Sequence, residues 1–140
     1  MITDLHLKYE KVVFSAEVAS MFAEIIDKDV SSKKVLVYIS KKAKEQLALD
    51  GSGSGVTINE IVENVEVDRS IRQAARGKSF TYKTVNTNIQ RKTAERIVDK
   101  LLDMSLIYYR PVKPYKFLFP TRRGLQVLGE ISKRTKGDEA

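Results

Sequence analysis

The chain has 140 residues and a formal net charge of +7, from 25 Lys and Arg against 18 Asp and Glu. That length is typical of a single domain with a sizeable core, and a composition that is 42% hydrophobic and 31% charged excludes wholesale disorder. No apolar run reaches the ~18 residues that a membrane span needs, cysteine is absent, and His6 is the only histidine. We therefore expect a cytoplasmic protein that uses no membrane, metal, disulfide or cofactor and that binds an acidic partner.

Residues 1–50 are expected to form scaffolding helices. Residues 5–14 alternate loosely between apolar and polar, which predicts a short strand or an extended arm. Ser15 is an N-cap residue for a first helix, and a Ser-Ser pair at residues 31–32 predicts a second helix that ends near Leu49. Because these helices carry little positive excess, we expect them to provide a dimer interface. The residues expected at that interface are Phe22, Ile25, Leu36 and Ile39.

The next segment combines a flexible tract with a helix start. Residues 51–55 alternate strictly between glycine and serine, which is typical of a flexible loop or of an engineered linker, so no function is assigned to them. Thr57 and Glu60 then form a capping box. The apolar residues that follow recur at i, i+3, i+4 and i+7, so they predict a short helix with one buried face.

Residues 66–87 carry weaker signals. Asp68 is placed to cap a further short helix over residues 69–76, which Gly77 would end. Residues 80–85 alternate and are partly β-branched or aromatic, which predicts a weak strand or an extended loop.

A long helix is predicted next. Thr87 and Gln90 form a second capping box, and the helix they open is expected to end near Met104. Its buried stripe is Ala94, Ile97, Val98, Leu101 and Leu102. A polar stripe lies on another face of its N-terminal half, at Asn88, Arg91, Lys92 and Glu95.

The last third of the chain predicts a hairpin and a closing helix. Residues 106–110 and 115–119 are β-like, and prolines bound the four-residue connection between them. Their aromatic residues are expected to pack the hairpin onto the core. Thr121 caps the last helix, and the residues after Lys133 predict a frayed polar tail. The expected fold class is mainly α with a small antiparallel β-hairpin (α+β), in one domain.

The charge is unevenly distributed along the chain. Residues 69–123 contain fourteen basic and three acidic residues, a net charge of +11, whereas the remainder contains eleven basic and fifteen acidic residues, a net charge of −4. A concentrated basic face attracts phosphates through counterion release, so this segregation favours nucleic acid as the partner. The alternative is a solvated basic surface without a partner.

The order of these elements resembles the winged helix-turn-helix superfamily, most nearly MarR-like regulators and the partition and replication proteins of plasmids and phages. Residues 57–62 resemble its first motif helix, residues 92–107 a recognition helix running into the wing, and residues 118–128 the end of the wing and the start of the closing helix. The resemblance covers about 100 of the 140 residues. It implies a winged helix with extra N-terminal helices, in which a recognition helix enters the DNA major groove.

Two registers for the base-reading helix remain open. In the preferred register the long helix reads bases, because the wing follows it and Arg, Asn and Glu are suited to guanine, adenine and cytosine. In the other register residues 69–76 are the reader, because 22 residues separate Val65 from Asn88 where the family has a short turn. A third possibility is that both segments touch DNA, the extra segment acting as a second contact. The DNA-binding residues predicted from the two registers and the wing are Asn88, Arg91, Lys92, Glu95, Arg96, Arg110, Lys113, Lys116, Arg69 and Arg72.

The function expected is sequence-specific binding of double-stranded DNA by a homodimer, as a transcription regulator or a mobile-element partition or replication protein. The alternative is a winged helix used for protein contact or for non-specific nucleic-acid binding, RNA included. Catalysis is not expected, because the paired carboxylates have surface-helix spacing without a His, Cys or Ser partner and no phosphate-binding loop is present. His6 is expected to be a surface residue and not a ligand.

Overall fold

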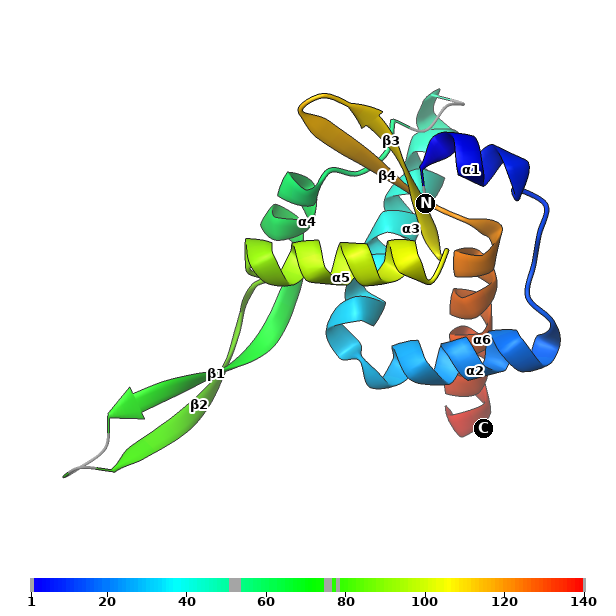
Figure 1. Cartoon of the computed structure of the whole chain (residues 1–140). Helices are drawn as coiled ribbons and strands as arrows, with labels where there is room; N and C mark the ends of the chain where they lie inside the picture. Colours follow the sequence, from blue (N-terminus) through cyan, green and yellow to red (C-terminus); the bar gives the residue numbers. More distant parts are fainter. Residues whose placement is uncertain (1, 51–53, 75–76, 78, 140) are drawn as a thin grey trace.

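The structure, a computed structural model, describes residues 2–50, 54–74, 77 and 79–139, with side chains for all of these except residues 50 and 135–139. Within these ranges it has an α+β architecture of six helices and two two-stranded antiparallel sheets (Figure 1). The helices are α1 (Thr3–Lys8), α2 (Ala16–Lys28), α3 (Val30–Asp50), α4 (Ile58–Asn64), α5 (Arg91–Asp103) and α6 (Arg122–Glu139). The strands are β1 (Glu66–Ala74), β2 (Phe80–Asn88), β3 (Ile107–Val112) and β4 (Tyr115–Pro120).

One core joins the helices to the β3–β4 hairpin. Its fully buried side chains come from α2, α3, α4, α5, α6 and both strands of that hairpin. The buried face predicted for α5 is confirmed, since Ala94, Ile97, Val98 and Leu101 are all buried. Leu36 and Ile39 are also fully buried in this core, so the prediction that they form a dimer interface is wrong. No helix in the described ranges is long and apolar enough to cross a membrane.

Three predicted helix starts are confirmed by their capping bonds. The hydroxyls of Ser15, Thr57 and Thr121 each accept a hydrogen bond from the backbone N–H three residues along the chain, at 3.3, 3.2 and 3.0 Å. The helix after Thr121 continues to Glu139, past the predicted start of a frayed tail at Lys133.

The cap of α3 differs from the prediction. Asp29, not the serine pair at residues 31–32, closes this end: its carboxylate accepts bonds from the Ser32 backbone N–H (3.2 Å) and hydroxyl (2.7 Å). The same carboxylate pairs with Lys100 of α5 at 2.8 Å. Burial raises the pKa of Asp29, but the bonds from Lys100 and Ser32 outweigh burial, and the net pKa lies below the ordinary value. This side chain therefore ties the α2–α3 junction to α5.

Residues 3–8 are helical, so the strand expected over residues 5–14 is wrong, and an extended arm is excluded for the helical residues 5–8. The loose alternation there does not face a sheet, because α1 packs across β3 and buries His6 against the Tyr108 ring. The Thr3 hydroxyl donates to the Tyr109 carbonyl oxygen at 2.8 Å and fixes the start of α1 on β3.

The structure differs most from the prediction over residues 66–90. β1 and β2 form an antiparallel hairpin with all nine residue pairs in register, in place of the helix predicted over residues 69–76 with its cap at Asp68. The weak strand predicted over residues 80–85 is confirmed and is longer than expected. The second capping box is also wrong, because Thr87 belongs to β2 and α5 begins only at Arg91. Pairing with β2 outweighs the helical preference of a segment that alone would make about two turns.

The β3–β4 hairpin is longer than predicted. Pairing continues to Val112 and Tyr115, so the expected four-residue connection shrinks to a two-residue turn. Val56 pairs with Leu118 on the outer edge of β4 through backbone bonds of 3.0 and 2.8 Å. Just before it, Gly55 has a φ of +85°, and a Cβ there would lie 2.8 Å from the Cβ of Phe117. Of the predicted glycine–serine tract, Gly55 is therefore required by the fold, whereas residues 51–53 lie outside the described residues.

Candidate nucleic-acid interface

The exposed face of α5 is the centre of the candidate interface. Its buried residues face the core, so Arg91, Lys92 and Arg96 are left in solvent at the N-terminal half of the helix. The Arg91 guanidinium donates to the carboxylate of Glu95 at 3.2 Å and also to the Asn59 side-chain oxygen on α4. Arg91 therefore holds α4 against α5, whereas no ion pair is found for Lys92 and Arg96 within the described residues.

Asn88 does not belong to the α5 stripe as predicted. It is the last residue of β2, and its side-chain amide donates to the backbone oxygen of Glu63 at 3.3 Å. This contact fastens the base of the β1–β2 hairpin to the end of α4. The exposed stripe of α5 consequently starts at Arg91.

The outer end of the β3–β4 hairpin supplies the second set of cations, Lys113 and Lys116, which are both exposed. Lys116 Nζ lies 4.9 Å from the centroid of the Tyr109 ring. Arg110 is also exposed, but it lies on the opposite face of the hairpin and lines a separate hollow with Leu47 and Leu125, so the structure does not bring it together with α5 as predicted. The turn faces the start of α4 and the exposed side of α5 across a cleft of about 300 Å³. This cleft is lined by Thr57, Ile58, Asn59, Arg91, Glu95, Asp99, Pro114, Tyr115 and Lys116.

The aromatic residues of β3 and β4 have mainly a packing role. Tyr108 stacks on His6, with ring centroids 3.6 Å apart and an interplanar angle of 3°, and also on Phe119 at 5.1 Å. The expectation that His6 is a surface residue is therefore wrong. Burial lowers the pKa of the His6 ring below its ordinary value, the negative charge of Glu10 opposes this shift, and the positive charge of Arg123 adds to it. Tyr115, at the turn, remains exposed.

Part of the basic segment is structural and not available to a ligand. Arg123 is only 3% exposed. Its guanidinium donates to the backbone oxygens of Val12 (2.7 Å), Tyr9 (3.0 Å) and Ser105 (3.3 Å). Together with the Lys100–Asp29 pair, this removes two cations from the free charge of residues 69–123. Sequence counting does not separate such internal cations from surface ones.

The β1–β2 hairpin carries the residues of the second predicted register, but on strands. Arg69 and Arg72 are three residues apart and so lie on opposite faces, which makes a helical base-reading surface over residues 69–76 wrong. The Arg72 guanidinium lies 4.2 Å from the Phe80 ring centroid. Lys83, directly opposite Ile71, was missed as a candidate, although the alternation of residues 80–85 could have shown it.

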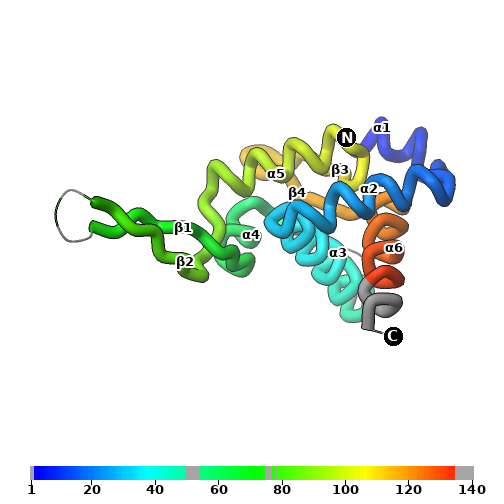
Figure 2. Tube along the Cα trace, turned by 90° about the horizontal axis from the view of Figure 1, so that it is seen from below, coloured from blue at the N-terminus to red at the C-terminus, as the bar shows by residue number. Residues whose placement is uncertain are grey.

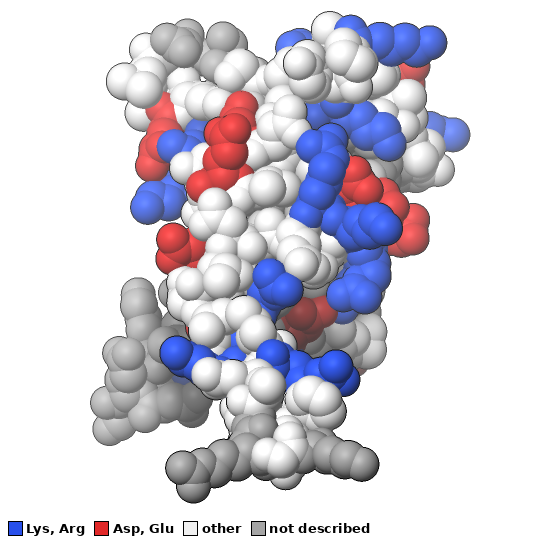
Figure 3. Space-filling view, turned by 90° about the vertical axis from the view of Figure 1, so that its left-hand side faces the viewer, with Lys and Arg blue, Asp and Glu red and all other residues white. Residues whose placement is uncertain are grey.

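These cations lie on one side of the molecule. In Figure 3, Lys and Arg side chains form a broken band that runs from the top of the view towards the β1–β2 hairpin at the bottom, with a few carboxylates between them. In Figure 1 the same side holds the β3–β4 turn, the start of α5 and the hairpin. The band fits a polyanion better than a small ligand.

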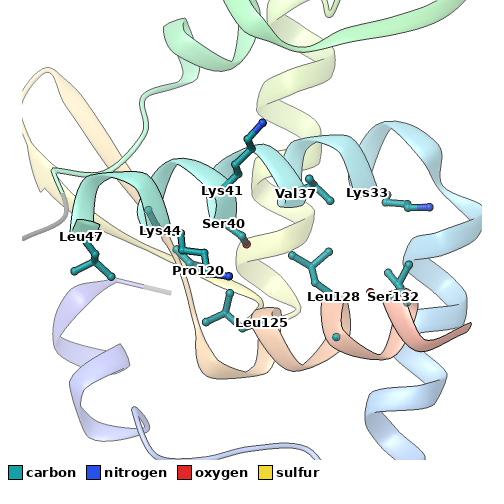
Figure 4. A pocket seen from close by; sticks show the side chains of 13 residues that line it. Lys33, Val37, Ser40, Lys41, Lys44, Leu47, Pro120, Leu125, Leu128 and Ser132 are labelled. Atoms are coloured by element: carbon teal, nitrogen blue, oxygen red, sulfur yellow. The ribbon is translucent and has the colours of Figure 1, made fainter. Parts of the chain in front are cut away.

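A second hollow lies between α3 and α6 (Figure 4). It has a volume of about 1000 Å³ and a mostly apolar lining, with lysines at its edges. Leu125 and Leu128 of α6 point towards α3, and the buried Ser40 hydroxyl has no hydrogen-bond partner among the described residues. The expected interface residue Phe22 instead stacks on Phe14 at 4.9 Å, within the protomer.

Comparisons with protein-family models, with curated proteins and with solved structures find no match for this chain. Within the described part of the chain, no three His, Asp or Glu side chains are grouped to hold a metal ion. The chemistry of the interface therefore follows from its own residues: hydrogen-bond donors and cations on α5 and on two hairpins, with two carboxylate acceptors, Glu95 and Asp99, in the cleft between them.

Proposed function

We propose that this protein binds double-stranded DNA in a sequence-specific manner as a winged helix-turn-helix protein. In this proposal α5 is the recognition helix and the β3–β4 hairpin is the wing. The order α3, α4, α5 and hairpin, with Val56 paired to β4 as a short additional strand, supports the assignment. The β1–β2 hairpin is an insertion between the two motif helices.

One observation carries the proposal: the exposed start of α5 and the turn of the β3–β4 hairpin meet across a single cleft, with cations on both sides. A recognition helix has to bury one face in its own domain and present the N-terminal half of the other face to base edges. A wing has to lie beside it at a distance that allows phosphate contacts. The exposed start of α5 fits the first requirement, and the neighbouring β3–β4 turn fits the second.

The residues divide into positioning and contacting groups. Arg91 is engaged by Asn59 and Glu95, so its role is to fix α4 against α5 and to orient the Glu95 carboxylate, which can accept a hydrogen bond from cytosine N4. Lys92 and Arg96 are free to contact phosphates or guanine. Lys113 and Lys116 contact the backbone beside the wing.

We further propose that the protein acts as a homodimer, because palindromic sites match the two-fold symmetry of proteins that read DNA with one helix. With Leu36 and Ile39 in the core, the contact surface is assigned to the hollow between α3 and α6. There Val37, Leu47 and Leu125 are between 42% and 57% exposed, more than an isolated domain needs to leave in water. Regulation of transcription and partition or replication of a mobile element both fit such a dimer.

A second function has one observation in its favour. Glu95 and Asp99 both line the cleft between α5 and the wing, and carboxylates there repel phosphates. A winged helix that uses this cleft to bind a basic protein segment is the alternative. It predicts complex formation that does not depend on DNA.

The proposal is tested by selecting bound duplexes from a random pool and measuring the stoichiometry on the selected site. We expect a few sequences to be bound far more tightly than bulk DNA, with two protomers per site. Uniform binding of all duplexes would overturn sequence-specific recognition.

Variants then locate the reader. The pair K92A/R96A should weaken binding to the selected site and relax its sequence preference, whereas R69A/R72A should keep the preference. The control K11A/K28A removes the same charge from the segment between α1 and α2 and from α2. If R69A/R72A abolishes selectivity and K92A/R96A does not, α5 is not the reading helix.

A further inference from the structure

The β1–β2 hairpin leaves the body of the molecule, as the cartoon and the Cα trace both show (Figures 1 and 2). Each strand has nine residues, so the hairpin extends roughly 30 Å. Its base is fixed to the body: Val67 is buried, and Lys34 Nζ donates to the Glu66 backbone oxygen at 2.9 Å. Further out, every described residue from Ser70 to Thr84 is exposed.

A two-stranded ribbon with water on both faces is marginally stable by itself. Here it also exposes large side chains, with Ile71 42%, Phe80 54% and Tyr82 73% exposed. Such an element contributes little to the stability of the chain that carries it. Its length and exposure instead provide a surface for a partner.

The charge of the hairpin indicates the chemistry of that partner. Its carboxylates, Glu66 and Asp68, lie at the base, and Asp68 accepts a hydrogen bond from the Asn86 amide at 2.9 Å. Beyond Asp68 the described residues include the cations Arg69, Arg72 and Lys83 and no carboxylate. The outer part is therefore basic, and the partner is a polyanion.

The cations occupy both faces of the ribbon. The register places Arg69 and Lys83 on one face, where they flank Ile71, and Arg72 on the other face, opposite Tyr82. A flat anionic surface would meet one of these faces only. A ribbon that enters a groove edge-on instead has one face towards each bounding phosphate backbone, and the DNA major groove, about 12 Å wide, admits a two-stranded ribbon.

We propose that the β1–β2 hairpin is a second DNA-binding element, which enters the major groove next to the site read by α5 and contacts phosphates on both of its sides. This inference rests on the proposed function and extends it: the reach of roughly 30 Å is close to one helical turn, about 34 Å. The hairpin adds affinity and footprint without adding sequence preference, because its cations contact the backbone. A second copy of the hairpin is disfavoured as the partner, since the cations Arg69, Arg72 and Lys83 of one copy would meet the same cations of the other.

The test compares two duplexes, the selected site alone and the same site with about ten more base pairs, one helical turn, on each side. We expect the wild-type chain to bind the longer duplex about tenfold more tightly. The variant R69A/R72A/K83A should lose this advantage and bind the short duplex within twofold of wild type. Its salt dependence on the longer duplex should fall by a log–log slope of about 2.7 per protomer, for three phosphate contacts.

Two further variants test whether the length advantage depends on the charge of the hairpin side chains and on the position of that charge. R69K/R72K/K83R keeps the charges and should keep the length advantage, and K8A/K11A/K28A removes three cations elsewhere and should leave it unchanged. A charge-removal variant that weakens both duplexes equally, or that alters the oligomeric state in sedimentation, would overturn the role of the hairpin. Selective binding by wild type with no length dependence would overturn this inference alone, whereas the absence of any duplex binding would overturn the proposed function with it.

Discussion

The two hairpins of this protein have the same topology and opposite surroundings. The β3–β4 hairpin is part of the core: Ile107 and Leu118 are fully buried, and Val56 pairs with the outer edge of β4. On the other edge, Ile2 pairs with β3 and α1 covers the Tyr108 ring. The β1–β2 hairpin has strands half as long again and pairs along all nine of its residues, yet the described residues of its outer part, from Ser70 to Thr84, are all exposed.

The comparison shows that strand pairing and strand burial have separate causes. Pairing needs only two extended segments and a turn, which both hairpins have. Burial needs a continuous apolar stretch on one face. β3–β4 has such a stretch in its inner part, around Ile107, Tyr109 and Leu118, with Lys116 of the same face at the exposed outer end, whereas on β1–β2 cations alternate with apolar residues on both faces. Neither face of the β1–β2 hairpin can therefore be covered by the body without burying a charge.

The sharpest test of this difference truncates one aliphatic side chain in each hairpin. L118A leaves a cavity at the centre of the core and should lower the free energy of unfolding by about 3 kcal/mol. I71A removes a side chain that is in contact with water and should change it by less than about 0.5 kcal/mol. The free energies of unfolding of both variants are measured by urea denaturation followed by circular dichroism. A large loss in I71A would show that the β1–β2 hairpin packs against something in the folded protein.

The elements of the body follow from local signals in the sequence. Apolar spacing located α2, α4 and α5, and three capping residues marked helix starts, because these signals act within one or two turns. The β1–β2 hairpin could not be predicted in the same way. Its first strand is stabilised by a partner that begins six residues further on, and the local pattern from Asp68 to Gly77 also satisfies the rules for a short helix. The burial of His6 likewise depends on Tyr108, about a hundred residues away.

A second test concerns Arg123, whose hydrogen bonds tie the segment after α1 to Ser105, which precedes β3. R123M keeps most of the side-chain volume but removes the bonds to the Tyr9, Val12 and Ser105 oxygens, and should cost about 2–3 kcal/mol of unfolding free energy. R122M, at the exposed neighbouring position, is the control and should cost less than about 0.5 kcal/mol. Thermal melts of both variants make the measurement. Equal effects at the two positions would contradict a structural role for Arg123.

The candidate site was predictable in part, for a physical reason. Charge segregation identified the segment that carries the exposed cations of α5 and of the two hairpins, and the apolar stripe of α5 identified which face stays free. Which cations have a structural role was not predictable. Arg123, Lys100 and Arg91 look like surface cations in the sequence, but in the structure each binds a residue from another part of the chain. Only the fold shows which cations have no internal partner to satisfy them.

A third test asks whether the two hairpins bind DNA in different ways. Removing both turn cations, K113A/K116A, should weaken binding of the selected site by about tenfold, or about 1.4 kcal/mol. Because the β3–β4 turn lies beside α5, the loss should be the same on short and long duplexes, whereas changes on β1–β2 should affect the long duplex alone. Fluorescence anisotropy at fixed salt measures both, with K11A/K28A as the charge-matched control. A loss that grows with duplex length would assign the flanking contact to the wrong hairpin.

The smallest expected effect is a pH dependence of the unfolding free energy, which comes from His6 where it packs on the β3–β4 hairpin. Burial against Tyr108 holds the pKa of His6 below 6.5, so the unfolded chain binds a proton more readily than the folded one. The stability that the neutral ring contributes is fully present above pH 6.5. It declines as the pH falls below 6.5 towards the folded-state pKa, because the unfolded state then gains a proton that the folded state does not.

Denaturant midpoints at pH 7.5, 6.5 and 5.5 should therefore fall slightly in the wild-type chain. H6F keeps an aromatic ring on Tyr108 but cannot titrate, so its midpoints should fall less across the same interval. Carboxylates such as Asp29 titrate at lower pH and contribute equally to both proteins in this window. If the denaturant midpoints of wild type and H6F change equally with pH, the ring of His6 is not buried in its neutral form. In that case α1 does not stay packed on β3 in solution.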